Sequence, residues 1–496
     1  MAFRRVWKEN QKKVRKSNCY MNKLNFIFIV LCFFFSPHLS AQEKEYGARN
    51  TFTVDDMEEL LMANHPIVKQ VNLLSETAKA QVTQALGKFD PTLNSSFKNK
   101  YFGNTDYYNQ WNSELKIPLW LAGADLKIAY DRNVGDYTNP QSRTNNAGLS
   151  AIGLSIPLGQ GLIVDSRRNT LQQAKAMISY LEGEKIKQIN AIWFQALSDY
   201  WNWYFAYQQY QLLLEGVKLA DQRFKAISEQ TTLGDKPVID SIEASVVVKE
   251  RRIELSKYEV ELKNAKIVLS NHLWNDQQFP VELPDHAIPH KLEDLVILPD
   301  NSVIEALLDS AKIAHPEMIK LASKNQQLLF EERYRKEMLK PKFNVSGTLI
   351  SSRHGFNDFV PPQYDFNWQN YKVGFEFAFP LFIRAERGKL KEVRIKQDQL
   401  RFEQAVTERN IYNEVVKKYN DLNAYSKQIE LQSINISNQE LLLRGELNKF
   451  ELGESTLFVV NSRENKLIEM RIKQEKLVTD YRKALAELYY KAGTKF

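Results

Sequence analysis

Residues 384–450 read RAERGKLKEVRIKQDQLRFEQAVTERNIYNEVVKKYNDLNAYSKQIELQSINISNQELLLRGELNKF, and this stretch decides the fold of the chain. It contains no proline and its apolar residues recur at helical spacing, so it predicts one unbroken helix of roughly 100 Å. The apolar positions step by threes and fours and then by sevens: Ile411, Val415, Tyr419, Leu422, Tyr425, Ile429, Ile436, Leu443 and Phe450. This narrow stripe predicts packing against other helices along one seam. A long structural coiled coil and one helix of a larger helical wall both fit this stretch alone.

The same order of sequence features occurs twice along the chain. An Asn-His-Pro motif at 64–66 and an Ala-His-Pro motif at 314–316 each precede a polar helical stretch, and a second proline follows the first by 25 positions in both cases. A Leu-Gly-acid motif later ends a long helical stretch in each half. Self-similarity of this kind is typical of a duplicated structural unit. We therefore divide the chain into a first repeat (42–274), a proline-containing linker (275–300) and a second repeat (301–496), and expect the two repeats to form one structural unit.

Each repeat is expected to contain one long helix and two shorter ones. The long helices are predicted at 166–232 and 384–450, and the shorter ones at 53–88, 236–273, 302–338 and 455–492. At a rise of about 1.5 Å per residue, two shorter helices stacked end to end nearly match one long helix. These lengths predict a long antiparallel α-helical cylinder of uniform height.

Alternating segments lie between the helices of each repeat. Residues 371–379 alternate apolar side chains with polar or small ones, and residues 343–349 do the same. A period of two with one apolar face is typical of β-strands, and the segments have about the length of transmembrane strands. Because a two-stranded hairpin is only marginally stable by itself, we expect an oligomer to pool its hairpins. The predicted fold class is mainly α with a membrane β-barrel portion, in which a trimer pools its hairpins into one barrel.

Repeat one contains additional residues before its long helix. Pro91 to Leu158 spans 67 positions, whereas Pro341 to Leu381 spans 40. The excess, around residues 105–140, is long enough for one more hairpin. The sequence leaves open whether this hairpin enlarges the barrel or forms a loop outside it.

The N-terminal segment has the organisation of a secretory signal peptide. Basic residues up to Lys23 precede an apolar run at 24–35 and a small-residue end at Ala41. The pattern predicts a signal peptide at 1–41, with Met21 as an alternative start because the signal is already complete from there. A membrane anchor and lipidation at Cys32 are alternatives. However, roughly 12 apolar residues are few for a membrane span, and Leu31 is bulky where lipoprotein signals need a small residue.

The leader accounts for the net positive charge of the chain. The full sequence has 67 Lys and Arg against 60 Asp and Glu; residues 1–41 hold eight basic residues and one acidic residue, which leaves 59 of each. Without a basic excess we expect no nucleic acid partner. Both cysteines, Cys19 and Cys32, are also in the leader, so the remaining chain has no thiol.

No enzyme, cofactor or metal signature emerges from the sequence. The motif at 159–161, Gly-Gln-Gly, lacks the third glycine of a dinucleotide-binding fingerprint. His286 and His290 have no neighbouring Cys or carboxylate cluster to complete a metal site. The aromatic run between Trp193 and Tyr210 is assigned to packing between helices. We expect no enzyme activity, no cofactor and no bound metal.

The ordered set of features resembles the TolC family of outer-membrane efflux proteins. The resemblance rests on the leader, the duplicated His-Pro starts, the Pro-Leu junctions at 157–158 and 380–381, and the Leu-Gly-acid turns at 233–235 and 452–454. It covers essentially the whole mature chain. It implies a homotrimer with a shared β-barrel in the outer membrane of a Gram-negative-type cell and an α-helical tunnel in the periplasm.

The resemblance also implies a function and partners. The chain would be the passive exit duct of a tripartite efflux or secretion system. Its partners would be a periplasmic adaptor (membrane fusion) protein, an inner-membrane pump and outer-membrane lipid. The alternative from another class is an exported coiled-coil scaffold or adhesin without channel activity.

By this resemblance the two glycine turns form the periplasmic tip. Adaptor contact is expected at Leu233, Gly234, Asp235, Leu452, Gly453 and Glu454. Candidate gate residues are Asp240, which matches a closure position of the family, together with Glu243 and Phe450. Phe450 stands where a tyrosine hydroxyl is expected, and Val459 and Ser462 stand where some members carry an acidic ring. Plain αα-hairpin turns and a solvated helix face are the alternatives, and the means of closure without the usual groups is open.

Overall fold

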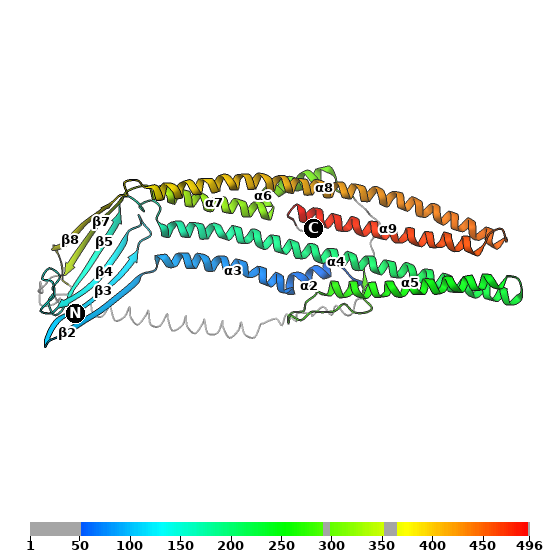
Figure 1. Ribbon diagram of the computed structural model, residues 1–496, viewed down its shortest axis with the longest axis horizontal. Coiled ribbons are helices and arrows are strands. Elements are labelled where there is room, and N and C mark those ends of the chain that lie inside the picture. Colours follow the sequence, from blue (N-terminus) through cyan, green and yellow to red (C-terminus); the bar gives the residue numbers. More distant parts are fainter. Residues whose placement is uncertain (1–50, 291–297, 352–364, 495–496) are drawn as a thin grey trace, which may run out of the picture. The chain divides into compact units, whose positions relative to one another are not determined.

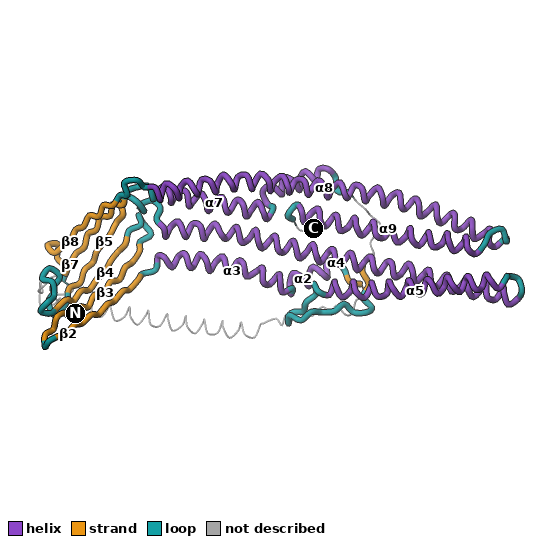
Figure 2. The backbone as a smooth tube through the Cα atoms, in the orientation of Figure 1, coloured by secondary structure: helices purple, strands orange, loops and turns teal. Residues whose placement is uncertain are grey.

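The computed structural model describes residues 51–290, 298–351 and 365–494 (Figure 1). The predicted signal peptide at 1–41, the alternative start at Met21 and both cysteines lie outside the described residues. Within them the chain is mainly helical and carries a six-stranded antiparallel sheet (Figure 2). A small parallel pairing also joins β1 (Thr51–Phe52) to β6 (Ile288–Pro289).

Two helices of 68 residues each dominate the fold, α4 (Ser166–Leu233) and α8 (Arg384–Glu451). Their bounds confirm the two predicted long helices to within one residue at each end. Along the predicted seam of α8, Val415 and Leu422 are fully buried, in a cluster shared with α9 (Leu457–Lys491). The apolar stripe read from the sequence is therefore a packing seam between helices.

The shorter helices follow the prediction with one correction. The segment after the first glycine turn is one helix, α5 (Val238–Ser270), as predicted. The helices predicted as continuous at 53–88 and 302–338 are each broken in two. The four resulting helices are α2 (Val54–Asn64), α3 (Pro66–Leu86), α6 (Asn301–Ala314) and α7 (Pro316–Glu337). Residues 87–89 form a short 3₁₀ turn, η1 (Gly87–Phe89).

Proline causes both breaks. Pro66 and Pro316 have no N–H, and a proline ring pushes the preceding residue out of the helical region. His65 and His315 are accordingly extended, with ψ of 128° and 132°. Each histidine Nδ1 accepts a hydrogen bond from the backbone N–H two residues on, at 3.2 Å, and so caps the helix that follows. The motif that revealed the duplication is therefore also a helix boundary.

The helix α4 is the centre of the helical packing. It lies beside α3, α5, α7 and α9, while α8 lies beside α7 and α9 (Figure 1). The core between α4, α2 and α5 contains the fully buried side chains of Tyr200 and Trp203, which confirms that the aromatic run serves interhelical packing. None of the helices in the described part of the chain combines the length and apolar character needed to cross a membrane.

The sheet lies where α3 and α7 end and α4 and α8 begin (Figure 1). Its strands follow the order β2-β3-β4-β5-β7-β8 and every neighbouring pair is antiparallel. The bounds are β2 (Thr92–Phe102), β3 (Thr105–Pro118), β4 (Asp125–Val134), β5 (Leu149–Pro157), β7 (Lys342–Ser351) and β8 (Phe366–Ala378). The pairing of β5 with β7 joins the two repeats. The extra residues of repeat one form β3 and β4 inside this sheet, which answers the question that the sequence left open for a single chain.

Candidate functional site: the helical turns and the sheet

Two helical hairpins end in matching turns at the end of the helices opposite to the sheet (Figure 1). Gly234 and Gly453 have φ values of +87° and +78°, which L side chains rarely adopt. The N–H of Asp235 donates to the carbonyl of Gln230 at 2.9 Å, and the N–H of Glu454 donates to that of Lys449 at 2.8 Å. A bond of this span with a left-handed glycine before the donor is a Schellman cap. A Cβ at either position would meet nothing within 4 Å, so there is room for a side chain. The left-handed φ is therefore the reason that both positions require glycine.

Both turns expose apolar side chains. Leu233 is 76% exposed and Leu452 is 75% exposed, and Asp235 and Glu454 beside them are exposed as well. Further exposed apolar side chains begin the helices that leave the turns: Val238, Ile239, Ile242 and Phe458. Exposed apolar groups gathered with acidic ones are typical of protein contact surfaces. We call the six turn residues and these four the tip surface.

A small core joins the two hairpins directly behind the turns. Ile227 of α4, Ala244 of α5 and Leu457 of α9 are buried together. The predicted gate residue Phe450 packs against this cluster from α8, and the Lys236 Nζ lies 3.8 Å from the centre of its ring. The structure thus places Phe450 in the contact between hairpins.

The other two predicted gate residues, Asp240 and Glu243, lie one helical turn apart on α5. Asp240 is in the first turn of α5 and partly exposed, with its N–H bonded to the carbonyl of Pro237. Glu243 lines a groove of about 720 Å³ between α5 and α9, opposite Val459 and Ser462. Asp240 and Phe450 are not part of that lining. The structure therefore brings Glu243, Val459 and Ser462 together in one groove, whereas Phe450 lies in the contact between the hairpins.

A buried ion group connects the hairpins farther from the turns. Glu464 of α9 accepts hydrogen bonds from Arg223 of α4 at 2.9 and 3.0 Å and from Arg251 of α5 at 2.5 Å. The side chains of Arg251 and Glu464 are only 4% and 6% exposed. Arg251 also donates to the carbonyl of Gly216 at 2.7 Å. One carboxylate thus holds three helices together.

The electrostatic environment of Glu464 favours its charged form. Burial by itself would raise the pKa of the carboxyl group, but the hydrogen bonds and charges of Arg223 and Arg251 outweigh burial and lower that pKa below its ordinary 4.5. The sequence analysis missed this group, although a signal is present. Arg251 follows the buried Ala244 and Val248 at helical spacing, and Glu464 occupies the same kind of position between Val460 and Leu467. A charge within an apolar seam needs a partner.

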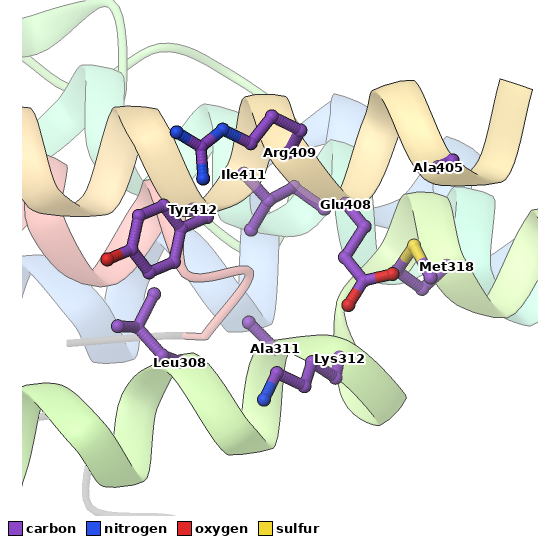
Figure 3. Close-up of a pocket in the computed structure, with 9 residues that line it drawn as sticks. All are labelled: Leu308, Ala311, Lys312, Met318, Ala405, Glu408, Arg409, Ile411 and Tyr412. Atoms are coloured by element: carbon purple, nitrogen blue, oxygen red, sulfur yellow. The ribbon is translucent and has the colours of Figure 1, made fainter.

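A pocket of about 320 Å³ lies near the break between α6 and α7 (Figure 3). Ile411 and Tyr412 of α8 point towards Leu308 and Ala311 of α6, and Lys312, Glu408 and Arg409 provide the charged part of the lining. No residue expected from the sequence to form a site lies here. The described part of the chain also holds no group of three or more His, Cys, Asp and Glu side chains placed to bind a metal ion.

The sheet has one apolar and one charged face. A single apolar row crosses all six strands through directly paired residues: Leu93, Leu115, Ile128, Ile152, Leu349 and Tyr371. On the other face of β3 and β4, Lys116 pairs with Asp125 at 3.0 Å, and Lys127 with Glu114 at 3.7 Å. The outermost strands, β2 and β8, each have a neighbour on one side only. This sheet is open, with apolar surface on one face.

Comparison with known proteins identifies the fold. No family model and no curated protein matches this chain. Solved structures match most of its length. The VceC outer membrane protein of Vibrio cholerae is 13% identical, with 89% of this chain and 96% of that chain covered at a TM-score of 0.61. The open-state MtrE outer membrane channel of Neisseria gonorrhoeae is 12% identical, with 89% of each chain covered at 0.61.

A third match is the CmeC outer membrane channel of Campylobacter jejuni, which is 12% identical, with 89% of this chain and 85% of that chain covered at a TM-score of 0.59. The chain has the fold of the TolC-family outer-membrane channels. The TolC fold confirms the predicted fold class of a long helical portion with a β-barrel portion, of which this chain supplies an open sheet. The adaptor-contact and gate assignments stay predictions.

Proposed function

We propose that this protein is the outer-membrane exit duct of a tripartite efflux or secretion system. The observation that carries the proposal is the placement of two unlike surfaces at opposite ends of the same helices. An open sheet with an apolar face lies at one end, and the exposed apolar turns lie at the other. The first surface suits lipid, and the second suits a protein partner. The solved structures of outer-membrane channels with the same fold support this assignment.

The open sheet supports assembly into a homotrimer with a shared barrel. The edge strands β2 and β8 leave backbone N–H and C=O groups unpaired, which is costly in lipid. Pairing the edge of one copy with the edge of the next satisfies both. The apolar row then faces outer-membrane lipid, and the helices extend into the periplasm.

The proposed partners are a periplasmic adaptor at the tip surface and an inner-membrane pump that supplies energy. The duct itself is passive and performs no catalysis. The tip closes through contacts between the helical hairpins, in which Asp240 and Glu243 take part. Phe450 has no hydroxyl group to donate, so it contributes packing and the contact with Lys236 in place of a hydrogen bond.

Membrane fractionation and efflux assays test this function. The protein is expected in the sarkosyl-insoluble outer-membrane fraction, as a heat-modifiable trimer in gels. Deletion of its gene together with complementation should show a loss and recovery of export of the cargo of the neighbouring pump. Recovery as a soluble periplasmic protein would favour the scaffold or adhesin alternative and overturn the proposal.

A further inference from the structure

The hairpin of β3 and β4 distinguishes the two repeats of this chain. In repeat two, β7 and β8 are consecutive in the chain and adjacent in the sheet. In repeat one, β2 and β5 are the strands that connect to helices α3 and α4, but β3 and β4 separate them. The described residues of each chain thus contribute six strands to this sheet, where two equal repeats of two strands would contribute four.

The inserted hairpin is built into the wall of the sheet. Eleven residue pairs join β2 to β3, with one register shift between Lys100 and Tyr101, ten join β3 to β4 and seven join β4 to β5. Leu115 of β3 lies opposite Leu93 of β2, and Ile128 of β4 lies opposite Ile152 of β5. The apolar row therefore continues across the hairpin and both neighbouring strands. A hairpin that lay outside the wall would not need to keep its apolar residues in register with both neighbours.

We propose that the trimer forms a barrel of 18 strands, six from each of three copies, in which β3 and β4 are wall strands. This inference rests on the trimeric duct proposed above. Six is an even number, so β2 runs away from the helices and β8 returns towards them. The β8 edge of one copy therefore meets the β2 edge of a second copy in antiparallel orientation, as closure requires. Barrel diameter grows roughly linearly with strand number, and barrels of about 16 to 18 strands enclose a water-filled channel.

The inserted hairpin also sets the character of the lumen. Its polar face carries Glu114, Lys116, Asp125, Lys127 and Asp131, of which the first four are paired as two cross-strand salt bridges and Asp131 is influenced by the charge of Lys372 of β8. Three copies place this set three times around the lumen. Because the two signs alternate, the wall creates no extended field of one sign, and the barrel admits hydrated solutes of either charge. Charge selection, where it occurs, belongs to another part of the duct.

Cysteine accessibility tests the position of the hairpin. In a background with Cys19 and Cys32 replaced by serine, the chain has no other thiol. Glu114→Cys and Lys127→Cys report the polar face, and Leu115→Cys and Ile128→Cys the apolar face. Ser346→Cys and Leu349→Cys on β7 are matched controls in a strand outside the insertion. With a membrane-impermeant maleimide on intact trimers in proteoliposomes, polar-face thiols should react about tenfold faster, because a thiol in apolar surroundings is a poor nucleophile.

The outcomes separate this inference from the proposed function. Alternation in β3 and β4 as well as β7 supports the wall position. Equal labelling of both faces of β3 and β4, with alternation kept in β7, overturns it while the trimeric duct stands. If Ser346→Cys and Leu349→Cys of β7 are labelled at equal rates and no trimer is recovered, the proposed function itself is contradicted. Strand counting by electron cryo-microscopy of the unaltered trimer is independent of any variant: 18 strands support the inference, and 12 contradict it.

Discussion

Glu464 is a charged residue in a buried helix position. It is almost fully buried, and Arg223 and Arg251 are its ion-pair partners within the described residues. Breaking a buried ion group by removing one member is costly, because the remaining charges lose their partner without regaining water. Exposed pairs contribute much less. The helices α4 and α5, which carry Arg223 and Arg251, also carry a more exposed pair, in which Asp221 of α4 lies 2.9 Å from Arg252 of α5.

The first prediction compares these two pairs. Glu464→Gln should lower the free energy of unfolding of the helical portion by about 3 to 5 kcal/mol, because the buried guanidinium group of Arg251 and the partly buried one of Arg223 then lack a neutralising charge. The matched control Asp221→Asn removes the same charge from a solvated pair and should cost less than about 1 kcal/mol. Thermal unfolding followed by far-ultraviolet circular dichroism measures both. Equal shifts for the two variants would contradict a buried role for Glu464.

The second prediction concerns pH. The pKa of Glu464 is lowered in the folded protein. The stabilisation from this group is therefore fully present above its ordinary pKa of 4.5 and is lost as the pH falls through the lowered folded value. The Glu464→Gln variant lacks this contribution at every pH. The difference in Tm between the two proteins should hence be largest near neutral pH and shrink on acidification below about pH 4; a difference that stays constant down to about pH 3 would rule this out.

The conformation of the two glycine turns could be predicted from the sequence, but their binding partner could not. Glycine after a long helical stretch, followed by an acidic residue, predicted both turns, and the left-handed φ values of Gly234 and Gly453 confirm the reason. The partner that the turns contact does not follow from the sequence, because the exposure of Leu233 and Leu452 shows that a surface is present but carries no information on which protein binds it.

The third prediction tests the tip surface. Leu452→Glu should reduce efflux at least about tenfold while trimer formation is kept, because a charge would replace the apolar group that the adaptor buries. Leu431→Glu is the matched control, since Leu431 is 62% exposed on α8, the helix that Leu452 caps, and lies 21 residues before Leu452 in the chain. Drug susceptibility and co-purification of the adaptor are the measurements. Unchanged efflux and adaptor binding in Leu452→Glu would refute the adaptor contact.

The elements also show where sequence reasoning ends. The packing seam of α8 could be predicted from local sequence rules, because Val415 and Leu422 are seven residues apart, which is two turns of a helix. The same rules predicted helices through Pro66 and Pro316 although proline disfavours this, because the apolar pattern continues on both sides of each proline. Arg251 and Glu464 are far apart in sequence, so their pairing depends on how α5 and α9 meet. The place of β3 and β4 in the sheet likewise depends on hydrogen bonds to strands that local spacing does not identify.

At the scale of the whole molecule, the largest apolar cluster of each repeat lies almost entirely within that repeat, and further contacts join the two repeats. The strand β5 of repeat one pairs with β7 of repeat two, and α4 of repeat one lies beside α7 and α9 of repeat two. The buried ion group joins them again through Arg251 and Glu464. Without the second repeat, α4 would expose much of its packing surface and β5 would become an edge strand. The duplication is therefore evident in sequence, and although each copy has its own apolar cluster, the contacts of α4 and the pairing of β5 with β7 lead us to expect that the two copies fold as one unit.

The fourth prediction follows from these contacts between the repeats. A chain of residues 1–290 and a second chain of residues 1–50 joined to 298–496 should each be degraded or aggregate when expressed alone, because each half lacks the partner for its buried surfaces. Co-expressed, the two halves should restore the heat-modifiable trimer. A protease site inserted between residues 290 and 298 of the intact chain is the control, since cleavage after folding should leave the trimer assembled. A protease-resistant, folded product from either half alone would show that the repeats are separate domains, and the description of one shared structural unit would then be wrong.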